Sequence, residues 1–240
     1  MPLADISYEK VSKLRYTIIY RLWIIVSGGF GILFVPICFD PVYQGYFYTF
    51  NSLISAQILF ELGVGFVITQ FSAHEMAHVN SPDGNQDGRN KAFDRLAQIY
   101  GFSGSWFLIA AIGYVLVVGT AGIYFFSSQG GLPFVSWGWP WILLIIFSGF
   151  NLRLSPYLAF LEGAGRIGEV ARLRLFQSVI GHSLMWGLLF IGAKLWALMF
   201  IPFLGAVCTA FWLGQQELIC EARSRLLAGV PHSINWRRDV

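Results

Sequence analysis

The segment Phe60–Val79, FELGVGFVITQFSAHEMAHV, places an acidic residue inside an apolar run and a HExxH pattern at the end of that run. Two kinds of protein would use such a segment. Either Glu61 lies on the polar wall of a pathway through a membrane, or His74 and His78 hold a zinc ion for hydrolysis. The composition of the chain decides what surrounds the segment.

The 240-residue chain is 56% hydrophobic and only 12% charged, with a mean hydropathy of +0.61. Soluble domains typically carry about 25% charged residues, so the apolar runs are expected to face lipid. The basic residues follow the ends of these runs instead of forming one face, which excludes a nucleic-acid-binding pattern. No two of the three cysteines form a CxxC pair. Their number and spacing therefore indicate neither a disulfide framework nor a cysteine metal site.

Six apolar runs meet or approach the roughly 20 residues that a helix needs to cross a bilayer. They are residues 16–39, 46–71, 99–126, 137–161, 175–191 and 195–213. Lipid offers no hydrogen bonds to the backbone and the runs lack period-two alternation, so each is predicted to be a helix. The predicted fold is an all-α, multi-pass membrane protein whose six transmembrane helices form a single domain over residues 1–240.

The basic residues predict the orientation of these helices. Fourteen of the 16 Lys and Arg residues lie at the N-terminus, at connections on the same side, or after the last run. Lys194 lies on the opposite side, and Arg153 lies within the fourth run. The positive-inside rule therefore predicts that both termini are cytoplasmic, together with a loop at 80–95 and a tail at 218–240.

Polar residues of the second run form a stripe on one helix face. At 100° per residue they fall within an arc of roughly 160°. The members are Asn51, Ser55, Gln57, Glu61, Gly65, Thr69 and Ser72. A buried, ionised and unpaired Glu is costly, so Glu61 is expected to be paired, hydrated or protonated. The stripe lines either a watery cavity or, with a protonated Glu61, a helix interface.

The fourth run carries a second stripe, formed by Ser148, Asn151, Ser155 and Glu162. Arg153 points the other way and is expected to pair with an acid on a neighbouring helix, Glu61 being one candidate. Arg21 lies at the inner end of the first run. Together these observations give the candidates for a substrate or ion pathway: Glu61, Gln57, Asn51, Arg21, Arg153, Asn151 and Glu162.

The HExxH pattern spans His74, Glu75 and His78. On a helix the two histidines share a face and Glu75 would serve as general base. The pattern lies just before Asn80, where the helix is expected to end, and a third ligand would have to come from Glu162, Glu169 or His182, none of them in a second motif. We interpret His74 and Glu75 as an interfacial polar cap, and predict no metal, cofactor or catalytic residue. A zinc metalloprotease at His74 and His78 is the alternative.

Two pairs of stretches resemble a known family. Phe60–Gly63 and Gln70–Glu75 are similar to the end of the second helix of bacterial polysaccharide flippases. Leu161–Gly165 and Val170–Gln177 resemble the end of the fourth helix and the start of the fifth in the same proteins. With the six-run spacing between them, the matches cover most of the chain. These flippases, like O-antigen translocases, belong to the multidrug/oligosaccharidyl-lipid/polysaccharide exporter superfamily.

The resemblance implies two six-helix lobes around a central cavity that opens alternately to either side of the bacterial inner membrane. It implies a lipid-linked oligosaccharide substrate, flipped to the outer leaflet for polysaccharide biosynthesis. Glu61 would face the cavity, and Arg21 or Arg153 would offset the phosphate charge. This chain corresponds to one lobe, so we expect a half-length or truncated transporter whose second lobe is a copy of itself or another chain. A non-transporting membrane assembly protein is a further alternative.

Overall fold

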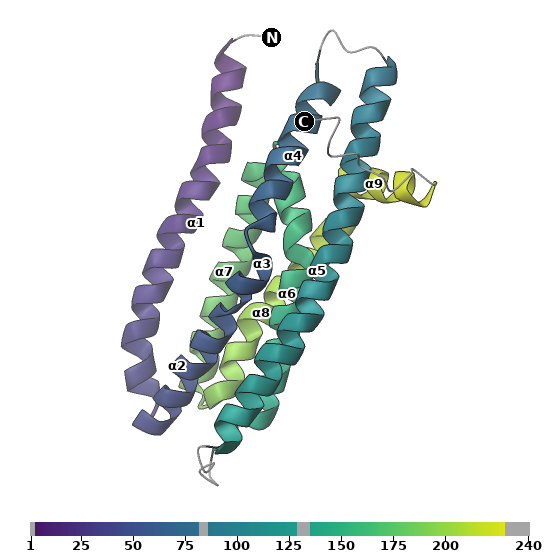
Figure 1. The fold of residues 1–240 in the computed structure, drawn as a ribbon. Helices are drawn as coiled ribbons and strands as arrows, with labels where there is room; N and C mark the ends of the chain where they lie inside the picture. Colours follow the sequence, from purple (N-terminus) through teal and green to yellow (C-terminus); the bar gives the residue numbers. More distant parts are fainter. Residues whose placement is uncertain (1–2, 82–85, 129–134, 229–240) are drawn as a thin grey trace.

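The structure, a computed structural model, describes residues 3–81, 86–128 and 135–228, and this part of the chain is helical throughout, without strands (Figure 1). The expectation of an all-α chain is therefore confirmed. The elements are α1 (Leu3–Cys38), α2 (Pro41–Ser55), α3 (Gln57–Glu61), α4 (Val64–Val79), α5 (Gln86–Ser128), α6 (Gly138–Gly163), α7 (Ile167–Phe190), the 3-10 helix η1 (Lys194–Met199), α8 (Phe200–Gly214) and α9 (Glu217–Leu227).

Four helical segments are long and apolar enough to cross a membrane: α1 from Arg15, α5, α6, and η1 with α8. The bent pair of α2–α3 and α4 makes a fifth if it counts as one span. The fifth expected span, 175–191, lies almost entirely within α7, which does not meet this standard among the described helices. Gln177, Ser178 and His182 lower the hydropathy of this helix. Their side chains line the cavity between the helices, so they do not face lipid. The chain thus fits a helical membrane protein with four to five long apolar helices.

The second expected span, 46–71, is broken into α2, α3 and α4. Leu62 and Gly63 both adopt left-handed backbone conformations, with φ of 48° and 71°, and the helices on either side meet at 45°. Glycine has no Cβ and enters this region freely, whereas a leucine there is strained. The break therefore lies directly after Glu61, in the middle of what the sequence presents as one apolar run.

The core is formed chiefly between α5, α6 and the elements of the broken span. Its largest fully buried side chains include Trp141, Tyr114 and Phe50. The Trp141 indole donates to the carbonyl of Gly119 at 3.1 Å and rests on Gly122, where a Cβ would lie only 2.3 Å from the ring. Glycine at 122 is thus required by close approach, and it lets α5 and α6 pack tightly.

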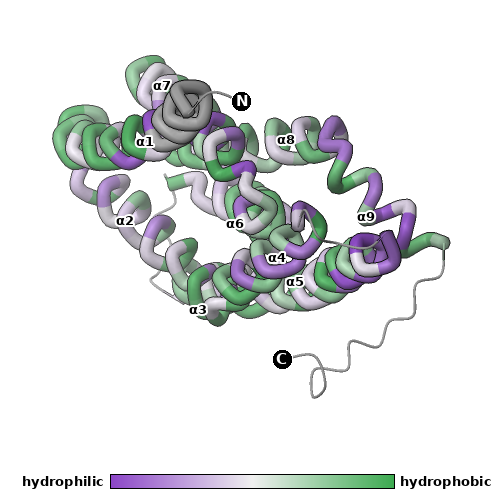
Figure 2. Tube along the Cα trace, turned by 90° about the horizontal axis from the view of Figure 1, so that it is seen from above, coloured by the Kyte–Doolittle hydropathy of each residue, from purple (hydrophilic) through white to green (hydrophobic). Residues whose placement is uncertain are grey.

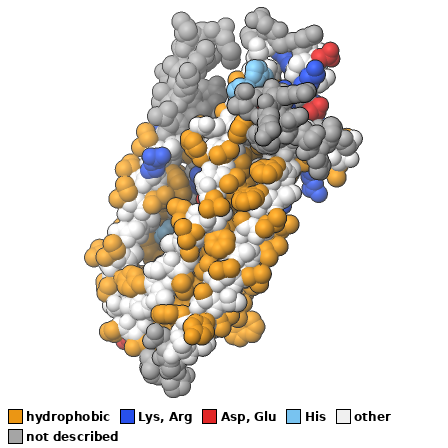
Figure 3. All heavy atoms as spheres, viewed as in Figure 1, with side chains coloured by type: hydrophobic (Ala, Val, Ile, Leu, Met, Phe, Trp, Pro, Cys, Tyr) orange, Lys and Arg blue, Asp and Glu red, His pale blue; other side chains and the backbone are white. Residues whose placement is uncertain are grey.

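The helix α1 stands apart from this core and packs chiefly on α7 (Figures 1 and 2). Most of its exposed, described side chains beyond Arg21 are apolar, for example Ile25 at 71% and Ile37 at 77%. The face of the bundle in Figure 3 is likewise covered by hydrophobic side chains, whereas Lys, Arg and His side chains gather toward the end where α4 ends and α5 begins. Such a surface suits hydrocarbon along the sides and water or head groups at that end.

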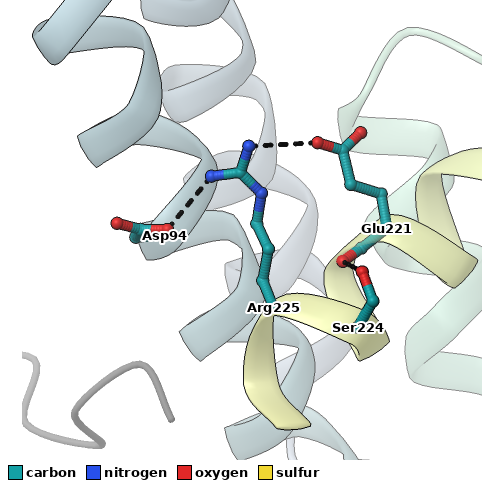
Figure 4. Close-up of polar contacts among 4 residues, drawn as sticks. All are labelled: Asp94, Glu221, Ser224 and Arg225. Atoms are coloured by element: carbon teal, nitrogen blue, oxygen red, sulfur yellow. Dashed lines mark hydrogen bonds and ion pairs between the residues drawn. The ribbon is translucent and has the colours of Figure 1, made fainter. Parts of the chain in front are cut away.

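Two segments assigned to polar connections are ordered helices at that end. Residues 86–95 of the expected loop 80–95 belong to α5, and residues 218–227 of the expected tail belong to α9, which packs chiefly on α5 and projects to one side of the bundle (Figure 1). The Arg225 guanidinium of α9 binds the Asp94 carboxylate of α5 at 3.1 Å and Glu221 at 3.2 Å (Figure 4). Residues 82–85 and 229–240 lie outside the described part. The cytoplasmic orientation of this end stays a prediction.

Candidate transport cavity

A partly open cavity of about 410 Å³ lies between α1, α2, α3, α6, α7, η1 and α8. Side chains of these helices line it. Its polar lining consists of Tyr20, Asn51, Gln57, Ser148, Asn151, Arg174, Gln177, Ser178 and His182. The remaining lining is apolar and includes Phe47, Leu144 and Met185. A polar interior in a membrane-type bundle is the usual location of a pathway or binding site.

Two amides anchor the wall formed by α8. The Asn151 side-chain nitrogen of α6 donates to the carbonyls of Phe147 at 3.0 Å and Pro202 at 2.6 Å. The Gln177 nitrogen of α7 donates to the Gly205 carbonyl at 3.3 Å and the Thr209 hydroxyl at 2.9 Å.

Gly205 makes this arrangement possible, since a Cβ there would lie 2.8 Å from the Asn151 side-chain oxygen. The two amides therefore tie α6 and α7 to the same stretch of α8.

The opposite wall comes from the first part of the broken span. The Asn51 nitrogen donates to the Phe47 carbonyl at 2.9 Å, and the Gln57 nitrogen donates to the Glu61 carboxylate at 3.1 Å. Glu61 itself is half-buried, behind Gln57 and next to the break. Glu61 is not among the lining residues, and it contacts the lining through the hydrogen bond from Gln57.

The α7 side carries the charged and titratable groups. The Arg174 guanidinium pairs with the Glu162 carboxylate at 3.0 Å, and both side chains are only partly exposed. Because the two charges offset each other, Arg174 brings little net positive charge to the wall. The Nδ1 atom of His182 lies 2.8 Å from the carbonyl of Ser178, one turn earlier in the helix.

The structure brings together only some of the residues expected from the sequence. Asn51, Gln57 and Asn151 line the cavity, whereas Glu61 and Glu162 lie behind the lining residues Gln57 and Arg174. The remaining two candidates, Arg21 and Arg153, are not part of the wall. Arg21 is exposed on α1.

The expected pairing of Arg153 with an acid is wrong in the described structure. Its guanidinium donates to the Tyr157 hydroxyl at 2.7 Å and lies 5.3 Å from the centre of the same ring. Arg153 borders a separate, largely apolar depression of about 260 Å³ between α5 and α6. The reason is helical phase: Asn151 and Arg153 are two residues apart on α6 and therefore point to different sides.

Arg174, Gln177, Ser178 and His182 were not recognised as one site from the sequence. A signal was present, because Arg174, just before the fifth run, and the three residues within that run follow helical spacing and share one face of α7. The apolar residues around them dominate the run and favour a plain transmembrane helix.

The HExxH pattern ends α4, as expected. The rings of His74 and His78 are exposed and lie 4.8 Å apart, while Glu75 turns inward, 3.5 Å from the Arg95 guanidinium. No group of three His, Cys, Asp or Glu side chains within the described ranges is arranged to hold a metal ion. For the zinc alternative, the structure therefore offers two ligands, His74 and His78. Glu75, which would be the general base, faces Arg95 instead.

Comparisons of the chain with protein-family models, with curated proteins and with solved structures found no match. The resemblance to polysaccharide flippases therefore depends on the sequence stretches quoted above.

Proposed function

We propose that this chain is a membrane transporter that moves a lipid-linked oligosaccharide between the two leaflets of a bilayer. The observation that carries the proposal is the cavity lined by polar side chains from α2, α3, α6 and α7, inside a bundle whose outer surface is apolar. Polar groups are expensive within a membrane and usually face a partner, a substrate or water. A volume of about 410 Å³ lies within the range of small-ligand pockets.

The broken span next to the cavity supports transport over a static role. Discontinuous helices are common where transporters bind their substrates, since the break lets one segment tilt while the other stays packed. Here the break has a 45° bend and two left-handed residues, one of them the strained Leu62. Backbone strain of this kind persists where the surrounding structure imposes it, and it often marks a moving part.

The oligosaccharide substrate is supported by the chemistry of the lining and by the family resemblance. Amides and hydroxyls hydrogen-bond sugar hydroxyls, while the apolar lateral surface can accommodate a lipid tail in the surrounding bilayer. A second lobe, formed by another copy or another chain, completes the proposed transporter. We place it in the inner membrane of a bacterium, with the basic end of the bundle in the cytoplasm.

The test uses purified protein in liposomes containing a fluorescent lipid-linked oligosaccharide. Translocation is measured as the fraction of substrate that becomes accessible to an external glycosidase. Wild-type protein should raise this fraction above that of empty liposomes, and the double variant Asn51→Leu/Gln57→Leu should lower the rate. Thr120→Val is the matched control, because Thr120 is exposed on α5 and bonds only to carbonyls of its own helix.

Folded wild-type protein that associates with itself and still gives the same signal as empty liposomes would refute the proposal and favour the assembly-protein alternative. Chemical cross-linking in the same liposomes reports whether two copies associate. No specific observation favours the zinc-protease alternative, and a stoichiometric amount of zinc in the purified protein would revive it.

A further inference from the structure

Four amide side chains line the cavity, and each directs its NH2 group toward a hydrogen-bond acceptor. In three of them the acceptor is a backbone carbonyl, which has no proton to donate, so the orientation of the amide is fixed by its partner. The acceptors are the carbonyls of Phe47, Pro202 and Gly205 for Asn51, Asn151 and Gln177, and the Glu61 carboxylate for Gln57.

The oxygen atom of each amide side chain has no hydrogen-bond donor within the described ranges. Across the described residues, none of these four oxygens accepts a hydrogen bond. His182 adds another polar group: its Nδ1 lies 2.8 Å from the Ser178 carbonyl, and its Nε2 makes no hydrogen bond with the described residues. The single guanidinium among the described lining residues, Arg174, is engaged by Glu162 at 3.0 Å.

A wall with four amide oxygens that are free among the described residues favours one class of head group. Hydroxyl groups donate to amide oxygens and to imidazole nitrogen, so a sugar ring satisfies the wall. The wall also carries donors, namely the hydroxyls of Tyr20, Ser148 and Ser178 and the second N–H of the Asn51 and Gln57 amides. A sugar hydroxyl both donates and accepts, so it can meet both kinds of group. A carboxylate only accepts, so it would leave the amide oxygens without donors, and the one guanidinium among the described lining residues is already paired with Glu162.

We propose that the cavity selects a neutral, hydroxyl-rich head group and disfavours an anionic one. This inference builds on the proposed function, since it names the kind of oligosaccharide that the transporter would accept: one whose leading sugar is uncharged. Hydroxyls and an ammonium group share the ability to donate hydrogen bonds, so the test must also separate a sugar from a cation.

The experiment measures binding to the protein in nanodiscs with three soluble amphiphiles of equal chain length. Octyl β-glucoside and octyl β-glucuronide differ by one group, CH2OH against a carboxylate, and octylammonium supplies a cation. Empty nanodiscs correct for partitioning into lipid. We expect the glucoside to bind at least about tenfold more tightly than the glucuronide, because a buried charged group without partners costs more than one neutral hydrogen bond gains.

Two variants connect the preference to the wall. Asn51→Leu and Gln57→Leu each remove one amide group from the wall, its free oxygen included, and roughly fivefold weaker glucoside binding is expected for each. Their NH2 groups bond only within the broken span, so neither change cuts a tie between distant helices. Asn151 and Gln177 are unsuitable because they hold α8. Thr120→Val should leave all three dissociation constants unchanged.

Several results would overturn the inference. Glucuronide binding as tightly as glucoside would show that the wall does not discriminate by charge. Preferential binding of octylammonium would make the cavity a cation site, and absence of binding by every probe would remove the site. If glucoside is preferred but lipid-linked oligosaccharide is not translocated, the proposed function fails and the selectivity stands. Translocation without any glucoside preference gives the reverse result.

Discussion

The packing of α4 on α6 gives the sharpest structural prediction, through the substitution Gly163→Ala. A Cβ at this position would lie 2.3 Å from the Thr69 carbonyl oxygen, 2.7 Å from the Ser72 Cβ and 3.1 Å from the Ala73 nitrogen. Ordinary contacts begin at 3.4 Å, so the two helices would have to separate by about 1 Å. Two of these three atoms are backbone, which cannot rotate away.

The expected magnitude follows from two opposing effects. Overpacking of this kind costs roughly 1–3 kcal/mol, and the separation also stretches the bond from the Thr69 hydroxyl to the Ala159 carbonyl, now 3.2 Å. Replacing a helical glycine by alanine otherwise gains about 0.5–1 kcal/mol. The net change in the free energy of unfolding should therefore be a loss of about 1–2 kcal/mol.

Thermal unfolding of the purified protein in detergent measures this change. A loss of that size lowers the melting temperature by roughly 2–8 °C for a chain of this length. The matched control is Gly28→Ala, since a Cβ at this helical position of α1 meets nothing within 4 Å and should cause no loss. A Gly163→Ala protein that melts at or above the wild-type temperature would refute the described contact between α4 and α6.

Three further predictions concern single interactions. Gly63→Ala should cost about 1–2 kcal/mol of unfolding free energy from the left-handed backbone alone, because its Cβ would meet no atom within 4 Å; equal melting temperatures would contradict the described break. Trp141→Phe should cost about 1 kcal/mol by removing the 3.1 Å bond to Gly119, and an unchanged melting curve would argue against that bond. A double-mutant cycle of Arg225→Ala and Asp94→Ala should give a coupling below about 1 kcal/mol, because both side chains are partly exposed; a coupling several times larger would mean a more buried pair.

The sequence predicted the helices well where the signal was local. Runs of apolar residues with few charges require helices in lipid, and α6 at Gly138–Gly163 lies close to the expected 137–161. The break after Glu61 was missed, because left-handed conformations at Leu62 and Gly63 leave no trace in an apolar run. Tight turns without polar residues or proline carry little composition signal.

The polar stripe of the second run shows how such a break changes a prediction. A continuous helix would have placed Asn51 and Thr69 on one face. In the structure Asn51 lines the cavity, whereas Thr69 donates to the Ala159 carbonyl and Ser72 is fully buried beside Gly163. The helical phase is reset at the break, so residues before and after it no longer share a direction.

The sequence alone determined that this chain is helical and apolar on its outside, because low charge and long hydrophobic runs leave the backbone no other way to satisfy its hydrogen bonds in lipid. The tertiary structure alone decided which polar residues meet. It joined Asn51, Gln57 and Asn151 to Gln177 and His182, and turned Arg153 away toward Tyr157. Such a meeting depends on the rotation and tilt of each helix against its neighbours, which packing between distant segments sets and no single stretch of sequence encodes.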